Sequence, residues 1–400
     1  MTMEIMVEKK HFSKELQLLL FFLDSKFEDK NLSKEKERFK DIDWNHFLQL
    51  TLHHRVYPIL YIRIKELNGD LIPAKVIGKL QQYYQTNIFQ MLKLTGESES
   101  ISRIFIDQKI RTLFLKGSIL GAHLYGDLSL RTSSDIDVLI PIEDLERAES
   151  TLLNLGYIKD DYILTVLNDW KWRHHHITFM HPQKKIKLEI HWRLNPGPSW
   201  NQSFEDLWER KKESSITDFP LYMLGEEDLF LFLVSHGARH GWSRLRWLVD
   251  IDRLVSRDLN WNCIKRLLKK YQLTQVGGQA LFLSSELLSS YSPHELKEIS
   301  NSKKSKRLAK GALFYIKQLV NLHIEPLPEE IANYHKSHLF SLMSFKQKVL
   351  FILSFLFPYP EDALAFPLPR VLHFLYFPLR PILWAIRRKR KQAMLQEDVT

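Results

Sequence analysis

Two aspartates separated by one residue stand in the apolar stretch "DIDVLI", residues 135–140. The stretch is typical of a buried β-strand, and because side chains alternate across a strand, Asp135 and Asp137 project from the same face. Close carboxylates repel each other unless a positive charge lies between them, and burying one without a partner is costly. A divalent cation meets both requirements, and Mg²⁺ prefers a few carboxylates, several waters and substrate phosphates. We therefore predict that Asp135 and Asp137 bind Mg²⁺, with Mn²⁺ as the alternative ion.

A Gly-Ser pair precedes the aspartates, between the short apolar run "IRTLFLKG" and the expected helix "SILGAHLYGD". Free backbone N–H groups and the helix dipole suit such a junction to phosphate, and glycine lets the phosphate approach closely. Ser118 adds a hydroxyl next to Gly117. Lys116 and Arg131 are further candidates for phosphate contacts, and the alternative for Arg131 is to neutralise the aspartates. The order of strand, Gly-Ser, helix, loop and Asp-x-Asp strand predicts a site for a triphosphate and its metal.

A third acid is expected on a neighbouring strand, and "KIKLEIHW" supplies Glu189, with Lys187 and His191 on the same face. Together with Asp135 and Asp137 it would complete a two-metal site, which activates the attacking oxygen and stabilises the leaving pyrophosphate. In this interpretation Glu189 is both a metal ligand and a group that positions or deprotonates the acceptor hydroxyl. The simpler alternative for these acids is the wet face of a strand.

The run "RHHHITFMH" invites a zinc interpretation, but alternation places His174 and His176 on one face and His175 on the other. We therefore expect at most two of these histidines to converge. Pairing with the Glu189 strand would bring His176 near the metal, where it would contact substrate or carry protons. A structural role is the alternative, and we predict it for His174 and His175.

In "SHGARHGW", His236 and His240 stand four residues apart on an expected helix, the spacing of a metal pair. Zinc proteases place a glutamate after the first histidine, whereas this chain has Gly237. We therefore prefer that this helix, with Arg246 and Asp250, forms a wall of the cleft and contacts nucleotide or acceptor. Helix packing is the alternative.

The elements that position these residues predict an α+β protein, in which a small mixed-sheet domain is flanked by N- and C-terminal helical domains. Helical spacing fills residues 1–95, where Pro58 is expected to kink or divide a helix. Residues 96–204 follow as strand, helix, strand, helix and hairpin, and residues 205–350 are again expected to be helical. The segment from residue 72 to 109 is expected to form one long helix or two stacked ones.

A Pro-rich apolar tail, residues 351–400, carries the basic run "RRKRK" at residues 387–391. One interpretation is peripheral contact with an anionic membrane surface. The alternative is that the apolar part packs onto the helical domain and the basic end is solvated.

Composition sets further limits. The 400 residues suggest two or three domains, and 44% hydrophobic with 26% charged residues is typical of a folded protein. The single cysteine, Cys263, excludes an intrachain disulfide framework and a cysteine-rich zinc site. With no expected signal peptide and no apolar run near the roughly 20 residues that span a bilayer, we expect a cytoplasmic protein. The net charge of +10 favours anionic partners such as nucleotides, nucleic acid or acidic lipid.

The motifs together resemble a known family. Gly117-Ser118, the Asp135–Asp137 strand and the later Glu189 strand are similar to the nucleotidyltransferase fold of the DNA polymerase beta superfamily. More closely, "LKG", "LYGD", "SSDIDVLI", "LEIHWRL" and "HGARHGWSRLRWLVDIDRL" resemble a bacterial family of uncharacterised nucleotidyltransferases. The resemblance runs from about residue 43 to 381. It implies that Asp135, Asp137 and Glu189 are metal ligands and that Gly117 and Ser118 bind phosphate.

The resemblance implies Mg²⁺-dependent transfer of a nucleoside monophosphate from an NTP to an acceptor hydroxyl or phosphate, with release of pyrophosphate. One alternative is a catalytically silent nucleotide-binding or regulatory protein of the same fold. Another is an enzyme that modifies nucleic-acid ends, which the basic charge permits but no aromatic or motif pattern supports. The acceptor, whether a small molecule, a peptide or a protein, stays open, as does the choice of NTP.

Overall fold

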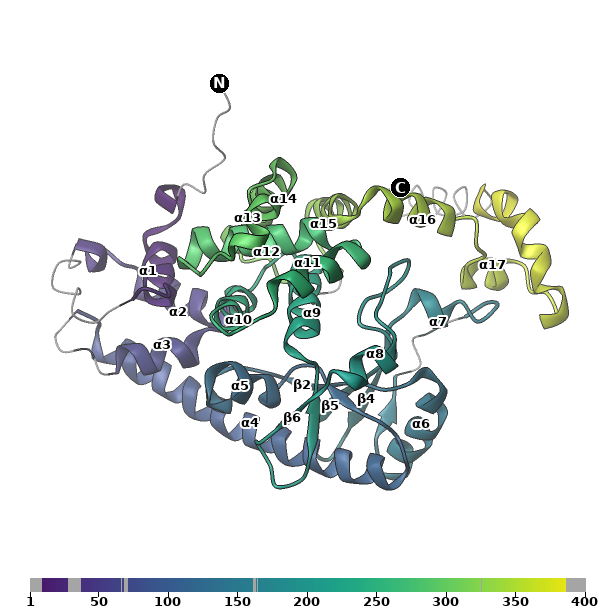
Figure 1. Cartoon of the computed structure of the whole chain (residues 1–400), viewed down its shortest axis with the longest axis horizontal. Helices are drawn as coiled ribbons and strands as arrows, with labels where there is room; N and C mark the ends of the chain where they lie inside the picture. The colour runs from purple at the N-terminus through teal and green to yellow at the C-terminus, as the bar shows by residue number, and fades with distance from the viewer. Residues whose placement is uncertain are drawn as a thin grey trace, which may run out of the picture.

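A computed structural model describes residues 9–385, apart from residues 28–36, 66, 68–70, 161–162, 164 and 325. A seven-stranded mixed sheet lies between helical regions, which confirms the expected α+β class. Figure 1 shows the sheet beside the long helix α4, with the C-terminal helices gathered on the other side of the picture.

The N-terminal region is helical, as predicted. Its helices are α1 (Lys14–Leu23), α2 (Trp44–His53), α3 (Tyr57–Ile64) and α4 (Ala74–Asp107), after the short 3₁₀ turn η1 (Lys9–His11). The Ser13 side chain caps α1, and Asp43 caps α2. Pro58 lies in the first turn of α3, where its missing N–H leaves no bond unmade, so the expected helix is divided there. The segment for which the sequence predicts either one long helix or two stacked helices is the single helix α4.

The strands follow the order β3-β4-β5-β2-β1-β7-β6 across the sheet. Their bounds are β1 (Leu113–Phe114), β2 (Asp135–Leu139), β3 (Ile158–Lys159), β4 (His176–His181), β5 (Ile186–His191), β6 (Lys212–Ser214) and β7 (Leu221–Met223). β4 and β5 form the predicted antiparallel hairpin, whereas β2 pairs with β5 in parallel. Strands β6 and β7 come from a segment for which only helices were expected. They are short, and the exposed residues of β6 give no alternating pattern.

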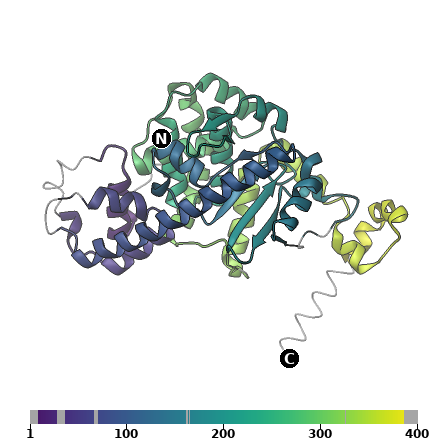
Figure 2. The ribbon, with the colours of Figure 1, turned by 90° about the horizontal axis from the view of Figure 1, so that it is seen from below.

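The helices between the strands include the two that were expected, α5 (Ser118–Tyr125) and α6 (Leu145–Asn154). Shorter elements are α7 (Trp170–Arg173), α8 (Phe204–Glu209), η3 (Leu128–Leu130) and η4 (Ile142–Asp144). Helix α4 contacts both β2 and β7 and crosses the sheet in Figure 2. It therefore joins the predicted regions 1–95 and 96–204 as one continuous element.

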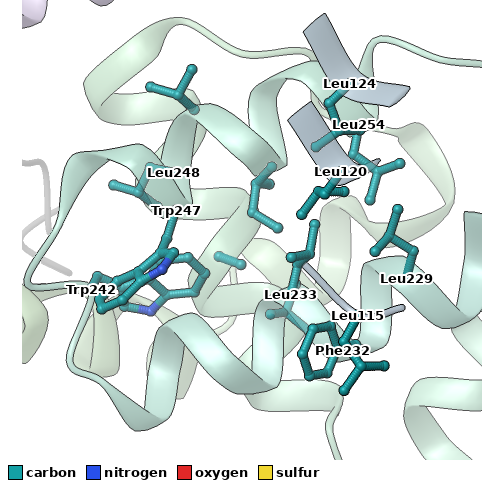
Figure 3. Packing of buried hydrophobic residues seen from close by; sticks show 14 of the residues in the cluster. Leu115, Leu120, Leu124, Leu229, Phe232, Leu233, Trp242, Trp247, Leu248 and Leu254 are labelled. Atoms are coloured by element: carbon teal, nitrogen blue, oxygen red, sulfur yellow. The ribbon is translucent and has the colours of Figure 1, made fainter. Parts of the chain in front are cut away.

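The C-terminal helices follow β7, and one of them, α10, contacts α5. They are α9 (Glu226–Arg239), α10 (Leu245–Val255), α11 (Trp261–Lys270), α12 (Thr274–Leu288), η5 (His294–Leu296), α13 (Lys297–Ser300), α14 (Lys303–Lys317) and α15 (Glu329–Leu342). Figure 3 shows Leu120 of α5 between Leu233 of α9 and Leu254 of α10, all almost fully buried. This apolar contact, at about 25 cal/mol per Å² buried, fixes α9 and α10 relative to the Gly-Ser junction at the start of α5.

The tail forms α16 (Phe345–Ser354), α17 (Pro360–Ala365) and η6 (Arg370–Leu375), which extend away from the other helices in Figures 1 and 2. Buried Arg380 pairs with Asp362, and Tyr376 packs in a small separate core. Large apolar side chains such as Phe345 (80% exposed) and Val371 (81%) face outward. The basic run lies outside the described residues, so membrane contact stays a prediction. No described helix has the length and apolar character that crossing a bilayer requires.

Candidate active site

Strands β2, β5 and β4 bring the predicted acids and two histidines to one face of the sheet. The parallel register sets Asp137 opposite Glu189, and the hairpin register sets His191 opposite His176. Since paired residues share a face and alternate residues return to it, Asp135 and the other four side chains all project the same way. The expectation that the acids come from adjacent strands is thus met by the geometry.

Cations hold these carboxylates in place. Lys116 Nζ lies 2.9 Å from Asp137 Oδ1, and Lys187 Nζ lies 2.5 Å from Glu189 Oε1. His191 Nε2 lies 3.2 Å from the same Asp137 oxygen and 3.5 Å from Glu189 Oε2. Asp137 is 1% exposed. A buried carboxylate needs such partners, because an isolated ion would be expelled or neutralised.

Burial and neighbouring charges shift the pKa values of these groups in opposite directions. Burial, helped by the charge of Asp137, raises the pKa of Asp135. Burial opposes ionisation of Asp137 too, but Lys116 and the hydrogen bond from His191 hold its pKa below the usual value. Burial likewise disfavours the charge on Glu189, yet the hydrogen bond from His191 and the charge of His176 bring its pKa well below normal. The pKa of His191 is raised, because its carboxylate bonds outweigh its burial.

The Gly-Ser junction has the backbone that a phosphate loop requires. Gly117 is the N-cap of α5 with φ +81°, a conformation that strains any residue with a Cβ. Ser118 begins the helix and is 3% exposed. Arg131 Nη1 donates to Gly117 O over 3.5 Å, while Arg131 Nε and Nη2 donate to Asp250 at 3.1–3.2 Å. Arg131 and Asp250 therefore form a buried brace behind the junction.

A cavity of about 750 Å³ opens over the carboxylates. Its walls come from the sheet, from α9 and α10, and from segments far away in the chain. Many of its charged and imidazole side chains are basic: Arg55, Lys116, Arg131, His175, His176, Lys185, Lys187, His191, His236, Arg239, His240, Arg244, Arg246 and His323, against Asp135 and Glu189. Such a concave, positively charged wall concentrates anions and suits a polyanionic ligand.

The wall opposite the sheet is built by the corner between α9 and α10. His236 and His240 lie with ring centroids 4.6 Å apart and both contact the Trp247 ring. Burial lowers the pKa of both well below the usual range, so both are neutral at neutral pH. Gly237 is required because a Cβ there would lie 2.4 Å from the Trp242 ring. Packing thus accounts for the glycine that stands where zinc proteases have glutamate.

The corner between α2 and α3 adds Arg55, a residue that sequence reasoning missed. The Arg246 backbone N–H donates to His54 O at 3.2 Å, and Arg244 Nη1 donates to His53 O at 3.0 Å. These bonds tie residues almost two hundred positions apart, so no local pattern marks Arg55 as a cavity residue. The φ of Arg55, +55°, is unusual for a residue other than glycine. Such backbone strain can mark a functional residue, but it is visible only in the structure.

The structure brings most predicted residues to one place. Those that line the cavity are Lys116, Arg131, Asp135, His176, Glu189, His191, His236, His240 and Arg246. Asp137 is buried beside them and bonded to Lys116 and His191. Gly117, Ser118 and Asp250 are not among the lining residues. Asp250 is fully buried and accepts bonds from Arg131 and from Tyr125 at 2.8 Å, so it positions other groups.

The carboxylate centre fits a cation. Asp137, Glu189 and His191 each offer a ligand atom, and these atoms lie within 4.8 Å of one another. Asp137 Oδ2 is buried and makes no hydrogen bond to any described residue. A buried, unsatisfied carboxylate oxygen costs about 1–3 kcal/mol or more, and a metal ion would satisfy it. Asp135 lies outside this group of ligand atoms.

Comparison with protein families agrees with this geometry. The profile described as "Uncharacterised nucleotidyltransferase" matches residues 40–289. The chain belongs to this family. The matched segment contains the Gly-Ser junction, the acids of β2 and β5, and the α9–α10 wall. No curated protein matches the chain. Membership in the nucleotidyltransferase family supports nucleotidyl transfer in general, and the printed description gives no acceptor.

Proposed function

We propose that this member of the nucleotidyltransferase family transfers a nucleoside monophosphate from an NTP to an acceptor hydroxyl or phosphate and releases pyrophosphate. We further propose that it shares the fold of the DNA polymerase beta superfamily and has a bacterial origin. The acceptor is an unidentified small molecule, peptide or protein.

One observation carries the proposal. Two parallel, register-paired strands carry the three acids: Asp135 and Glu189 line the cavity, and Asp137 is buried beside them. Lys116, which directly precedes the Gly-Ser junction, lines the same cavity together with the basic wall. If the acids had only a structural role, the further basic side chains of the cavity would not be needed, because Lys116 and Lys187 already balance two of the negative charges. The surplus of basic side chains in the cavity instead calls for a ligand with several negative charges, and a triphosphate has them.

Different residues of the chain would bind different parts of the NTP. The backbone N–H groups at the start of α5 and the Ser118 hydroxyl would donate hydrogen bonds to phosphate oxygens, and the helix N-terminus carries the positive end of the helix dipole. Arg239, whose Nη1 is buried and has no hydrogen-bond partner among the described residues, would pair with an anionic oxygen. Glu189 would orient the acceptor hydroxyl toward the α-phosphorus.

Mg²⁺, or Mn²⁺ as the alternative, would be held by Asp135, Asp137 and Glu189. When bound, such an ion supplies Lewis-acid stabilisation for the attacking and leaving oxygens. Lys116 contacts Oδ1 of Asp137, and Oδ2 makes no hydrogen bond within the described part of the chain, so the ion pair and the metal would use different oxygens of the same carboxylate.

The test is transfer of label from α-³²P NTPs to acceptors in a cell extract, followed by separation of the labelled products. We expect metal-dependent labelling by wild type and its loss in the double variant Asp135→Asn/Asp137→Asn. The exposed Asp107→Asn variant is the matched control and should label like wild type. Equal labelling by the double variant would refute the proposal. Labelling confined to nucleic acid would favour the end-modifying alternative, and NTP binding without transfer would favour the silent one.

A further inference from the structure

Three histidines converge next to the carboxylate centre. His175, His176 and His191 each offer a ring nitrogen, and these atoms lie within 4.8 Å of one another. The expectation from strand alternation, that His174 and His176 share a face and His175 lies on the other, is wrong. His175 and His176 meet instead, and His191 on β5 supplies the third member. His175 contributes because it precedes β4, so strand alternation does not govern its direction. The His175 carbonyl accepts from Trp192 N at 3.0 Å, which holds it beside the end of β5.

The spacing of His175 and His176 suits two ligands of one ion. Nitrogen ligands lie about 2.0–2.1 Å from zinc-like cations, so neighbouring ligand atoms are about 3.0–3.4 Å apart in octahedral or tetrahedral sites. His175 Nε2 and His176 Nδ1 are separated by 3.2 Å. A direct hydrogen bond between the two imidazoles has the same length, so this distance alone does not distinguish a metal site from a hydrogen bond, and a second observation is needed.

The second observation is an unsatisfied nitrogen on His191. Its side chain is 5% exposed, and its Nε2 faces Asp137 Oδ1 at 3.2 Å. Its Nδ1 is buried and has no hydrogen-bond partner among the described residues. Metal-binding histidines usually donate the other ring N–H to a carboxylate, which orients the ring and fixes the tautomer. The bond from His191 Nε2 to Asp137 is such an arrangement, and it leaves Nδ1 for an ion.

The donor set selects the class of metal. Mg²⁺ takes oxygen ligands, whereas imidazoles suit Zn²⁺, Fe²⁺, Ni²⁺ and related ions. We propose that His175, His176 and His191 bind one divalent transition-metal ion, in addition to the Mg²⁺ position at the carboxylates. Glu189, with Oε2 at 3.9 Å from His176 Nε2 and 3.5 Å from His191 Nε2, adds negative charge beside this histidine site. The proposal does not depend on nucleotidyl transfer.

The test is titration of chelator-treated full-length protein with Co²⁺ alone, without nucleotide, followed by visible absorption. We expect one equivalent to bind, with displacement by Zn²⁺ and none by excess Mg²⁺. His175→Ala and His176→Ala should each weaken binding more than about tenfold, because even outer-shell partners of a metal ligand are worth about 10–100-fold. His174→Ala, next in sequence but outside the cluster, is the matched control and should bind like wild type.

Circular dichroism and thermal unfolding show whether each variant is folded, and His175→Gln and His176→Gln replace any alanine variant that is not. Failure of folded wild type to bind Co²⁺ would overturn the proposal, as would histidine variants that bind like wild type; the 3.2 Å contact would then be a hydrogen bond. Asp135→Asn separates the two hypotheses, since it should lose Mg²⁺-dependent NTP binding and keep the Co²⁺ site. Either hypothesis can therefore fail alone.

Discussion

The buried brace of Arg131 and Asp250 offers a prediction whose size follows from the structure. Asp250 is fully buried and Arg131 is 1% exposed, with three bonds of 3.1–3.2 Å between them. Asp250→Ala leaves a buried guanidinium without its counter-charge, which costs about 3–5 kcal/mol. At a slope of about 3 kcal/mol per molar urea, the unfolding midpoint should fall by about 1–1.7 M.

The assay is urea unfolding followed by tryptophan fluorescence, with two comparisons. Arg111 and Glu205 form a bidentate pair on the surface, so Glu205→Ala should shift the midpoint far less. The double variant Arg131→Met/Asp250→Leu should be more stable than Asp250→Ala, because no unpaired charge remains. An Asp250→Ala shift no larger than that of Glu205→Ala would refute the reasoning, and so would a double variant less stable than the single one.

Three further predictions concern other sites. Gly117→Ala should cost about 1–3 kcal/mol of unfolding free energy, because φ is +81°, and should weaken NTP binding; equal stability in urea would contradict this. Arg239→Met should raise the unfolding free energy by about 1–3 kcal/mol while lowering NTP affinity, since its buried Nη1 has no partner among the described residues; unchanged NTP titrations would contradict the assigned role. Burial lowers the pKa of His338 to about 4, so its neutral form favours the folded state above the unfolded pKa of about 6.5. Wild type should lose stability relative to His338→Gln as pH falls from 6.5 to 4, in unfolding measured at each pH; a constant difference would refute the shift.

Sequence predicted the parts of the site that depend on local pattern. The Asp135–Asp137 strand, the Gly-Ser junction and the β4–β5 hairpin follow from alternation, glycine placement and a turn between two apolar runs, and these rules act over a few residues. The sheet could be predicted only in part, because β6 is short and mostly exposed. Its pairing with β7 rests on a hydrogen-bond register that leaves no pattern of apolar residues.

Residues set by distant contacts could not be predicted. Arg55 reaches the cavity only because the α2–α3 corner bonds to the α9–α10 corner, and His175 joins the histidine cluster only because it precedes β4. Helix α10 lines the cavity, as was expected of the helix that carries Asp250. The Asp250 side chain is not among the lining residues and instead accepts hydrogen bonds from Arg131 and Tyr125. Sequence spacing places a residue on an element, and tertiary packing decides which partner that residue contacts.

The most direct test of the central claim is binding of labelled ATP, GTP, CTP and UTP to the purified chain, with and without Mg²⁺, beside the Asp137→Asn variant. The account predicts that at least one NTP binds in the presence of Mg²⁺ and that folded Asp137→Asn loses this binding. Wild type that is folded and binds none of them, or an Asp137→Asn variant that binds like wild type, would contradict it.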